Sequence, residues 1–458
     1  MKTTYTSIIV LLLLTMNVSC RKYLETKQYG DILPETATDF SALLHGHLSS
    51  VDGASDRYIL GSHTNVLDFE SYCDNLNASL STAFDLSPYV GTDINRLYYR
   101  FMNFYSNIKD YNIILDRFPS PSTDEEKKIV AVAHSMRAVA YFNLVREFCE
   151  PYETGGAAQQ AGIPIVSSFN MEAKPARGNL RDAVQFIVDD LKAALAVGQT
   201  DELYRFTDDV AKAYLVRIYH WSQQWEAAIP LAKELLEKYP ISTGQDYVSL
   251  MQTGPGPKSG SVIIRSYISG TLTSFTRVTT RMKTRPVSVD FVQLFTEKSR
   301  DIRYTFYFDN NLLNAKGAHN WIRSEEMCLA LAESYAHTGN NEDALAYLNL
   351  LRGKRIADYT PYTLQTLPAT NPKTLIQVDA TGKSLTPLLS AILNERRKEL
   401  YMEGDRWYEM KRNGRPEFWV GHNGIRYVTE KYLYTFPIRK GEMILNPLIT
   451  QNEGYENM

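Results

Sequence analysis

Hydrophobic side chains return at helical spacing along most of this chain. Between residues 93 and 118, aromatic and aliphatic residues recur every three or four positions, which predicts an amphipathic helix. Thr123 follows, with Glu126 three positions later, and this pair predicts a capping box at the start of a second helix that ends near residue 148. The same spacing predicts further helices over residues 179–197, 208–221, 225–238, 325–337 and 341–352.

Two of the predicted helix pairs share an internal spacing. Tyr219 stands nine positions before Ala228, and Tyr335 stands nine positions before Ala344. An aromatic residue late in one helix and a small residue early in the next is typical of tetratricopeptide-like hairpins. The pattern predicts a mainly α fold, with such hairpins packed against an irregular, loop-rich region with few short strands. The expected hairpins cover approximately residues 93–148, 179–238 and 321–353, and the insertion regions cover 242–320 and 354–385.

Segment 391–412 mixes apolar residues with a dense set of charges and predicts one more helix, which Gly404 ends or kinks. Glu399 and Glu403 lie one helical turn apart, and a like-charge pair of this kind requires nearby cations. Two such carboxylates also resemble the acid and base of a glycoside hydrolase. We favour a structural lattice, because arginines would keep both carboxylates charged, whereas a general acid needs a raised pKa. These arginines are Arg396, Arg397 and Arg406.

The sequence of the amino terminus is typical of a targeting signal. Residues 1–19 combine a basic start with an apolar core that is too short to span a bilayer, which predicts a secretory signal peptide. Cys20 follows two small residues and is predicted to become the acylated first residue of the mature protein, anchoring it to membrane lipid. The remaining cysteines are predicted to be buried free thiols: Cys73, Cys149 and Cys328.

Composition narrows the classes of function. The chain has 458 residues, of which 44% are hydrophobic and 22% charged, with a formal net charge of −3. This balance suits a large globular core and argues against nucleic acid as a partner. No P-loop, dinucleotide fingerprint, nucleophile triad or zinc spacing stands in a suitable context, so no cofactor, no metal and no catalytic residue is predicted.

The charged segment near the carboxyl end also carries a family resemblance. It resembles the signature N-E-R-R-x-E-L-x-x-E-G-x-R-W of the SusD/RagB family of outer-membrane nutrient-binding lipoproteins. The start of the mature chain at Cys20 and the carboxyl end from Phe436 to Tyr455 resemble the same family, and the latter predicts a tail strapped onto the body. The matching signature residues are Asn394, Glu395, Arg396, Arg397, Glu399, Glu403, Gly404, Arg406 and Trp407.

The resemblance implies one SusD-like domain over residues 20–458, lipid-anchored in the outer membrane and exposed at the cell surface. It implies capture of an oligosaccharide and delivery to a SusC-like TonB-dependent transporter, with no chemical step. The first alternative keeps the import role but changes the cargo to peptides, as in RagB-like members. Alternatives from other classes are a glycoside hydrolase that uses Glu399 and Glu403, and a protein-interaction scaffold suggested by the helical repeats.

Aromatic side chains in the predicted loops are the candidate ligand contacts. The chain has 30 Tyr, 18 Phe and 5 Trp, and flat rings can bury the C–H faces of sugars while polar neighbours satisfy the hydroxyl groups. Residues 61–91 and the cluster after residue 303 lack a helical period and are predicted to be exposed loops. We hypothesise that one to three of six residues touch the ligand: Tyr72, Phe84, Tyr89, Tyr304, Tyr307 and Trp321.

Overall fold

The structure is a computed structural model. It describes residues 34–52, 58–61, 63–76, 94, 96–170, 172–252, 258, 260–266, 287–422 and 424–456. The predicted signal peptide with Cys20, and the candidate residues Phe84 and Tyr89, lie outside these residues. Within the described part of the chain, no helix combines the length and the apolar character that crossing a bilayer requires.

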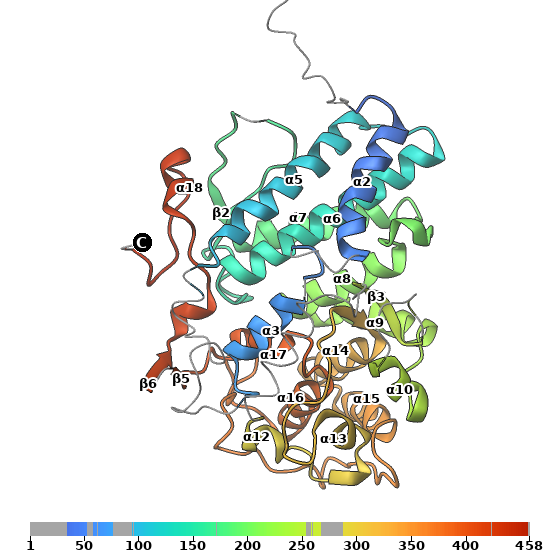
Figure 1. Cartoon of the computed structure of the whole chain (residues 1–458), viewed down its shortest axis with the longest axis vertical. Coiled ribbons are helices and arrows are strands. Elements are labelled where there is room, and N and C mark those ends of the chain that lie inside the picture. The colour runs from blue at the N-terminus through green and yellow to red at the C-terminus, as the bar shows by residue number, and fades with distance from the viewer. Residues whose placement is uncertain are drawn as a thin grey trace, which may run out of the picture.

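Helices make up most of the described chain (Figure 1). The α-helices are α2 (Ala37–Asp52), α3 (His63–Tyr72), α5 (Tyr99–Arg117), α6 (Asp124–Phe148), α7 (Leu180–Leu195), α8 (Asp208–Trp221), α9 (Trp225–Lys238), α10 (Gly244–Gln252), α12 (Val289–Val292), α13 (Ile302–Tyr307), α14 (Ser324–His337), α15 (Asn341–Gly353), α16 (Pro387–Glu399), α17 (Asp405–Arg412) and α18 (Lys440–Leu445). The 3-10 helices are η1 (Glu202–Tyr204), η2 (Lys298–Arg300) and η3 (Lys431–Tyr434).

The described strands form antiparallel pairs. β1 (Ala161–Pro164) pairs with β2 (Arg177–Asn179), β3 (Val262–Arg265) with β4 (Trp321–Arg323), and β5 (Phe418–His422) with β6 (Ile425–Thr429). Each sheet has two strands, so sheets play a minor part in this mainly α fold. The predicted fold class is confirmed.

Consecutive helices pack against each other and build the body of the molecule. α5 packs on α6, α6 on α7, α7 on α8 and α8 on α9, and α9 also contacts α14, which packs on α15 and α16. The capping box at Thr123 is confirmed, because its side chain accepts from Glu126 N while the Glu126 carboxylate accepts from Thr123 N. Helix α6 is buried over almost its whole length and lies at the centre of the main hydrophobic core.

Two local predictions are wrong. Residues 63–72, expected to be part of an exposed loop, form α3, and the aromatic cluster after residue 303 forms α13 rather than a polar loop. In both segments tertiary contacts override the local pattern.

The break expected at Gly404 in segment 391–412 is present. Two helices, α16 and α17, are separated by a turn in which Met402 (φ 63°) and Gly404 (φ 72°) adopt left-handed conformations.

The carboxyl end lies against the body, as predicted. Asn452 Nδ2 donates to the carbonyl oxygens of Phe148 (3.0 Å) and Phe436 (2.7 Å), and Arg177 Nη1 donates to Asn452 Oδ1 at 2.7 Å. These bonds tie the last described segment to the end of α6 and to β2. The three predicted free thiols are also confirmed, since all are buried and unpaired: Cys73, Cys149 and Cys328.

Candidate functional site

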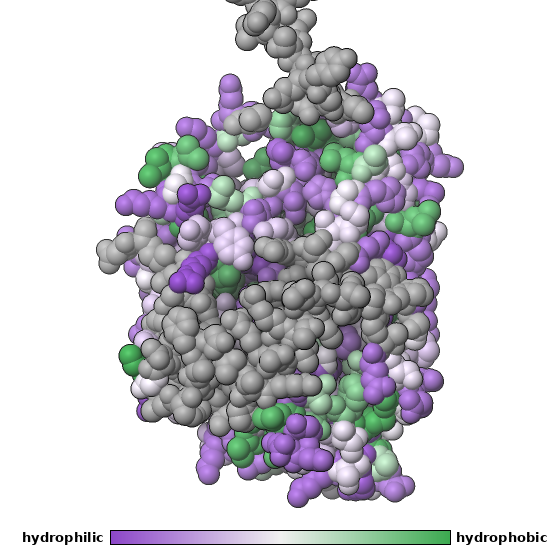
Figure 2. All heavy atoms as spheres, viewed as in Figure 1, coloured by the Kyte–Doolittle hydropathy of each residue, from purple (hydrophilic) through white to green (hydrophobic). Residues whose placement is uncertain are grey.

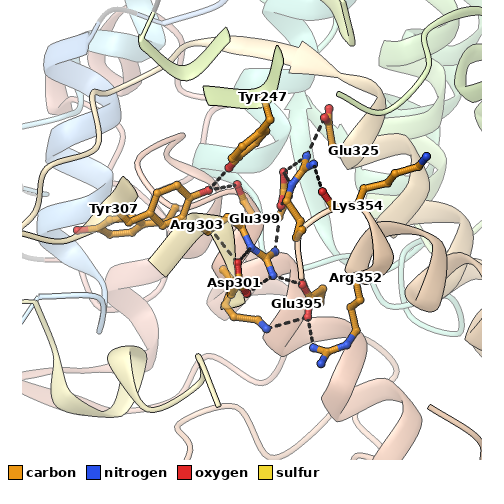
Figure 3. Close-up of polar contacts among 12 residues, drawn as sticks. Tyr247, Asp301, Arg303, Tyr307, Glu325, Arg352, Lys354, Glu395 and Glu399 are labelled. Carbon is orange, nitrogen blue, oxygen red and sulfur yellow. Dashed lines mark hydrogen bonds and ion pairs between the residues drawn. The ribbon is translucent and has the colours of Figure 1, made fainter. Parts of the chain in front are cut away.

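Glu399, the last residue of α16, lies at the centre of a buried cluster of charges (Figure 3). Its Oε1 accepts from Arg323 Nη1 at 2.6 Å and from Arg355 Nη2 at 2.9 Å, while its Oε2 accepts from Arg303 Nη1 at 3.0 Å. All four of these residues are at most 2% exposed. The cluster therefore joins α13, β4 and the turn after α15 to the charged segment through one carboxylate.

Glu395 and Glu403 extend this cluster on either side of Glu399. Glu395 contacts Arg303 Nη2 at 2.6 Å and Arg352 Nη1 at 2.8 Å, and it lies between these two side chains in Figure 3. Glu403 accepts from Lys316 Nζ at 2.9 Å. We call the three glutamates and their basic partners the signature lattice; the partners are Arg303, Lys316, Arg323, Arg352 and Arg355.

The arginines predicted to hold Glu399 and Glu403 bind other carboxylates instead. Arg396 Nη2 lies 2.5 Å from Asp405 Oδ1, whereas Arg397 Nη2 and Arg406 Nε lie 3.1 Å and 2.8 Å from the Asp74 carboxylate. The prediction failed because the true partners of Glu399 lie far away in the sequence, where helical spacing gives no signal. The structural role predicted for this segment nevertheless holds, since each of these side chains connects separate elements.

The electrostatics of the signature lattice do not suit a general acid. Burial alone would raise the pKa of Glu399, but the guanidinium groups of Arg355, Arg323 and Arg303 hold it well below its usual value. A carboxyl group in this setting stays ionised, whereas a glycoside hydrolase needs one carboxyl group that is protonated at working pH. With Glu399 0% exposed, its carboxylate also lacks access to a glycosidic bond. This geometry argues against the hydrolase alternative.

A second set of contacts connects the charged segment to α3. Glu70 Oε1 accepts from the backbone N–H groups of Met402 (3.0 Å) and Gly404 (3.2 Å), which fixes the left-handed turn between α16 and α17. Its Oε2 accepts from Asn75 Nδ2 at 2.9 Å. Burial raises the pKa of Glu70 to about 7, although these hydrogen bonds act to lower it. Burial has the larger effect because, among the contacts described, no cation pairs directly with the carboxylate. The end of α3 is thus held by the signature segment.

The candidate aromatic residues that the structure describes are buried or half-buried. Tyr72 is 3% exposed and packs against Trp407, and Tyr307 is 0% exposed and donates to or accepts from Tyr247 OH at 2.7 Å. Tyr304 is half-buried against Phe295. The expectation that these residues form exposed loop platforms is therefore wrong, since the helices that contain them turn the rings inward.

Trp321 borders a small central cavity. The cavity has a volume of about 110 Å³ and is lined by charged residues from α6, α8, α14, α16 and α17. Its charges are largely neutralised by internal ion pairs, such as Arg217 with Glu326 at 2.7 Å and Arg412 with Glu333 at 2.6 Å. Ligand sites for drug-sized molecules usually exceed about 300 Å³, so we attribute this cavity to the scaffold rather than to a site for an oligosaccharide.

A larger open groove lies beside the β5–β6 hairpin. Its volume is about 440 Å³, and its walls come from the turn after α3, the start of α12, residues 373–375, α16 and the hairpin. We call it the hairpin groove. Charged and aromatic side chains line it, among them Asp74, Asp290, Lys373, Arg397, Trp419 and Arg426.

Two aromatic residues among those described line this groove, Phe418 and Trp419. Strand alternation places Trp419, its cross-strand partner Val428 and Arg426 on the same face of the hairpin, while Val420 faces the core at 2% exposure. The Arg426 guanidinium carbon lies 4.8 Å from the centre of the Trp419 ring, and the ring itself is half-buried. The β5–β6 hairpin therefore places the Trp419 ring beside the charged side chains of the hairpin groove.

Sequence reasoning missed Trp419, although a signal was present. Asn423-Gly424 stands between two short runs of alternating hydrophobic residues, which is a strong local indication of a hairpin. That signal predicts which residues share a face. It does not predict that the turn after α3 lies next to the hairpin, because those segments are far apart in the chain.

The surface drawn in Figure 2 is mixed. Among the residues shown in colour, hydrophilic side chains predominate and hydrophobic ones form small separate groups. Within the described residues, no group of three or more His, Cys, Asp or Glu side chains is placed to hold a metal ion.

Two family matches cover most of the chain. Residues 22–220 match the SusD-like family described as starch-binding and associating with the outer membrane, and residues 295–455 match the SusD family that includes RagB. The second match contains the signature lattice and the hairpin groove's β5–β6 wall. This chain belongs to the SusD/RagB family.

Solved structures agree with this assignment of the fold. A SusD superfamily protein from Bacteroides thetaiotaomicron is 20% identical with a TM-score of 0.68, covering 91% of this chain and 100% of that one. A second from Bacteroides vulgatus is 18% identical with a TM-score of 0.69, covering 92% and 100%. A laminarin-binding SusD-like protein is 17% identical with a TM-score of 0.60, covering 90% and 99%. No curated protein matches the chain.

Proposed function

We propose that this protein binds oligosaccharides at the cell surface and that the hairpin groove is its binding site. The observation that carries the proposal is the half-buried ring of Trp419 beside an open groove of about 440 Å³ with charged walls. The family descriptions, and the printed name of the laminarin-binding relative, support sugar as the cargo.

The groove matches the chemistry of a sugar ring. A pyranose has an apolar face of C–H groups that can stack on an indole, and hydroxyl groups around its edge that need donors and acceptors. Lys373 and Arg426 supply exposed donors, and Asp290 and Glu417 supply exposed acceptors, all lining the groove. These groups stand on segments that the helical body holds in place, which suits recognition of a ligand.

Affinity electrophoresis tests the proposal. Native gels are cast with starch, laminarin, other neutral glycans and acidic glycans, and the migration of the wild type is compared with that of Trp419→Ala. We expect at least one glycan to retard the wild type and the variant to lose most of that retardation. Phe169→Ala is the control, because Phe169 is an exposed aromatic residue (44%) outside the groove.

Three results would count against it. Retardation by no glycan, with binding of peptides in calorimetry, would favour the RagB-like cargo. Retardation that Trp419→Ala leaves intact would place the site elsewhere. New reducing ends released from a bound glycan, and lost in Glu403→Gln, would restore the hydrolase alternative.

We further propose that the protein is anchored to the outer membrane by an acylated Cys20 and passes its cargo to a SusC-like TonB-dependent transporter. The signal-peptide pattern, the cysteine that follows it and the family's outer-membrane association support this role. Binding without chemistry can drive such transfer if the ligand favours one conformation of the complex over another.

Membrane fractionation tests the anchor, and co-purification tests the partner. We expect Cys20→Ala to leave the outer-membrane fraction and to lose incorporation of labelled palmitate, while Cys149→Ala keeps both. We expect the detergent-solubilised wild type to co-purify with a TonB-dependent transporter. Wild-type protein that carries no acyl group would contradict the proposed anchor, and recovery without any transporter would contradict the proposed partner.

A further inference from the structure

Arg397 links the signature segment to the hairpin groove. Its Nε donates to Asn75 Oδ1 at 2.8 Å, and its Nη2 donates to the Asp74 carbonyl oxygen at 2.9 Å and lies 3.1 Å from the Asp74 carboxylate. The guanidinium also lies 5.2 Å from the centre of the Phe291 ring. Arg397 is 4% exposed, yet it is among the residues that line the groove.

One donor of this arginine is left over. No hydrogen bond to any described residue uses Arg397 Nη1, although its other two nitrogens are engaged. A nitrogen that faces an open groove can donate to a bound ligand, and a charged acceptor forms a stronger hydrogen bond with a guanidinium than a neutral one does. Arg397 Nη1 can therefore donate a hydrogen bond to a ligand in the open groove.

Two further cations stand along the same groove. Lys373 and Arg426 line it, both are exposed, and neither forms an ion pair with a described residue. The negative charge of Asp74 is already shared between Arg397 and Arg406, which hold its pKa at about 2 although burial would raise it. The remaining lining carboxylates, Asp290 and Glu417, are exposed, as are Lys373 and Arg426, so solvent screens these four charges more strongly than that of the buried Arg397.

We propose that Arg397 is a ligand-binding residue and that, with Lys373 and Arg426, it selects oligosaccharides that carry an anionic ring substituent, a carboxylate or a sulfate ester. The proposal rests on the proposed function, and it adds the substrate class and a role for a signature residue beyond bracing the fold. The anionic oxygen would accept from Arg397 Nη1 while the sugar ring covers Trp419. This arrangement uses the nitrogen of Arg397 that forms no hydrogen bond with a described residue.

Isothermal titration calorimetry tests the substrate class. The purified mature protein is titrated with an oligouronate and its carboxyl-reduced counterpart, and with a sulfated oligosaccharide and its desulfated counterpart. We expect one anionic ligand to bind at least about tenfold more tightly than its neutral partner at moderate salt. The pair that shows the difference distinguishes carboxylate from sulfate ester.

Variants then test the residues. We expect Lys373→Ala/Arg426→Ala to lose about tenfold in affinity for the anionic ligand and less than about twofold for the neutral one. Lys127→Ala/Lys192→Ala, which removes two exposed lysines outside the groove, should change neither. Arg397→Lys should weaken anionic binding to a similar extent if its melting curve shows a folded protein; if it does not fold, the surface double variant decides.

The outcomes separate the two proposals. Equal or tighter binding of the neutral ligands, still dependent on Trp419, would overturn the anionic class and leave the proposed function intact. An anionic preference that survives the groove variants would overturn the assignment to Arg397, Lys373 and Arg426. Binding of no glycan of either kind would remove the proposed function, and this inference with it.

Discussion

At the scale of single residues, the signature lattice depends on the charge of Glu399. Glu399→Gln keeps the shape of the side chain but removes one negative charge that three buried guanidinium groups share, on Arg303, Arg323 and Arg355. Removing one partner from a buried ion pair typically costs about 3–5 kcal/mol, so we expect a loss of that size in the free energy of unfolding.

Urea denaturation of the mature protein measures this loss. Glu237→Gln is the matched control, because Glu237 is exposed on α9 and should change stability by less than about 0.5 kcal/mol. A Glu399→Gln variant as stable as this control would show that the lattice contributes little to the fold.

Glu70 predicts a dependence of stability on pH. Its pKa rises from an ordinary value of 4.5 to about 7 in the folded protein, chiefly through burial. The folded state therefore holds a proton that the unfolded state releases, so this stabilisation is complete below pH 4.5 and is lost as pH rises through 7. The loss amounts to about 3 kcal/mol.

Comparing the wild type with Glu70→Gln isolates this effect from other titrating groups. The free energy of unfolding of the wild type, minus that of the variant, should fall by about 3 kcal/mol between pH 4.5 and pH 8. A difference that stays constant over this range, or that grows with pH, would contradict the account of the Glu70 site.

Single residues were only partly predictable from the sequence. The charged segment could be assigned a structural role from its composition, because arginine and glutamate at this density must pair when buried. The partners of Glu399 could not be predicted from the sequence, since only the tertiary fold brings Arg303, Arg323 and Arg355 close to it. The same limit explains why Tyr72 and Tyr307 were misplaced on the surface.

At the scale of elements, the repeated hairpins depend on small residues at the helix contact. Ala344 is 0% exposed near the start of α15, where α15 packs on α14. We expect Ala344→Leu to overpack this contact and to lower the free energy of unfolding by about 1–3 kcal/mol. Ala346→Leu is the control, because Ala346 is exposed on the same helix. Equal effects of both substitutions, measured by urea denaturation, would argue against close packing at Ala344.

Long amphipathic helices were the most predictable elements. α8 and α9 begin and end where helical spacing placed them, because their apolar faces are continuous and their ends carry clear signals. α3 was missed because His63–Tyr72 lacks a strong apolar stripe and is held by distant contacts, such as those of Glu70 with the α16–α17 turn. Elements stabilised mainly by the rest of the fold leave little trace in their own sequence.

At the scale of the whole molecule, the signature segment and the proposed binding site are one connected structure. Glu399 ties α16 to α13, β4 and the turn after α15, Glu70 ties the α16–α17 turn to α3, and Arg397 holds the turn after α3 that borders the groove. The helical body could be predicted from periodicity and the family from its motifs. The hairpin groove could not be predicted from the sequence, because its walls come from segments that only the folded chain brings together.

The central claim is that sugar binds in the hairpin groove with a ring against Trp419. A crystal structure of the protein with an oligosaccharide that it retains in affinity electrophoresis tests this claim most directly. The account predicts a sugar ring stacked on Trp419, with polar contacts to groove residues such as Arg426 and Lys373. Oligosaccharide bound against another part of the surface, with the hairpin groove empty, would contradict it.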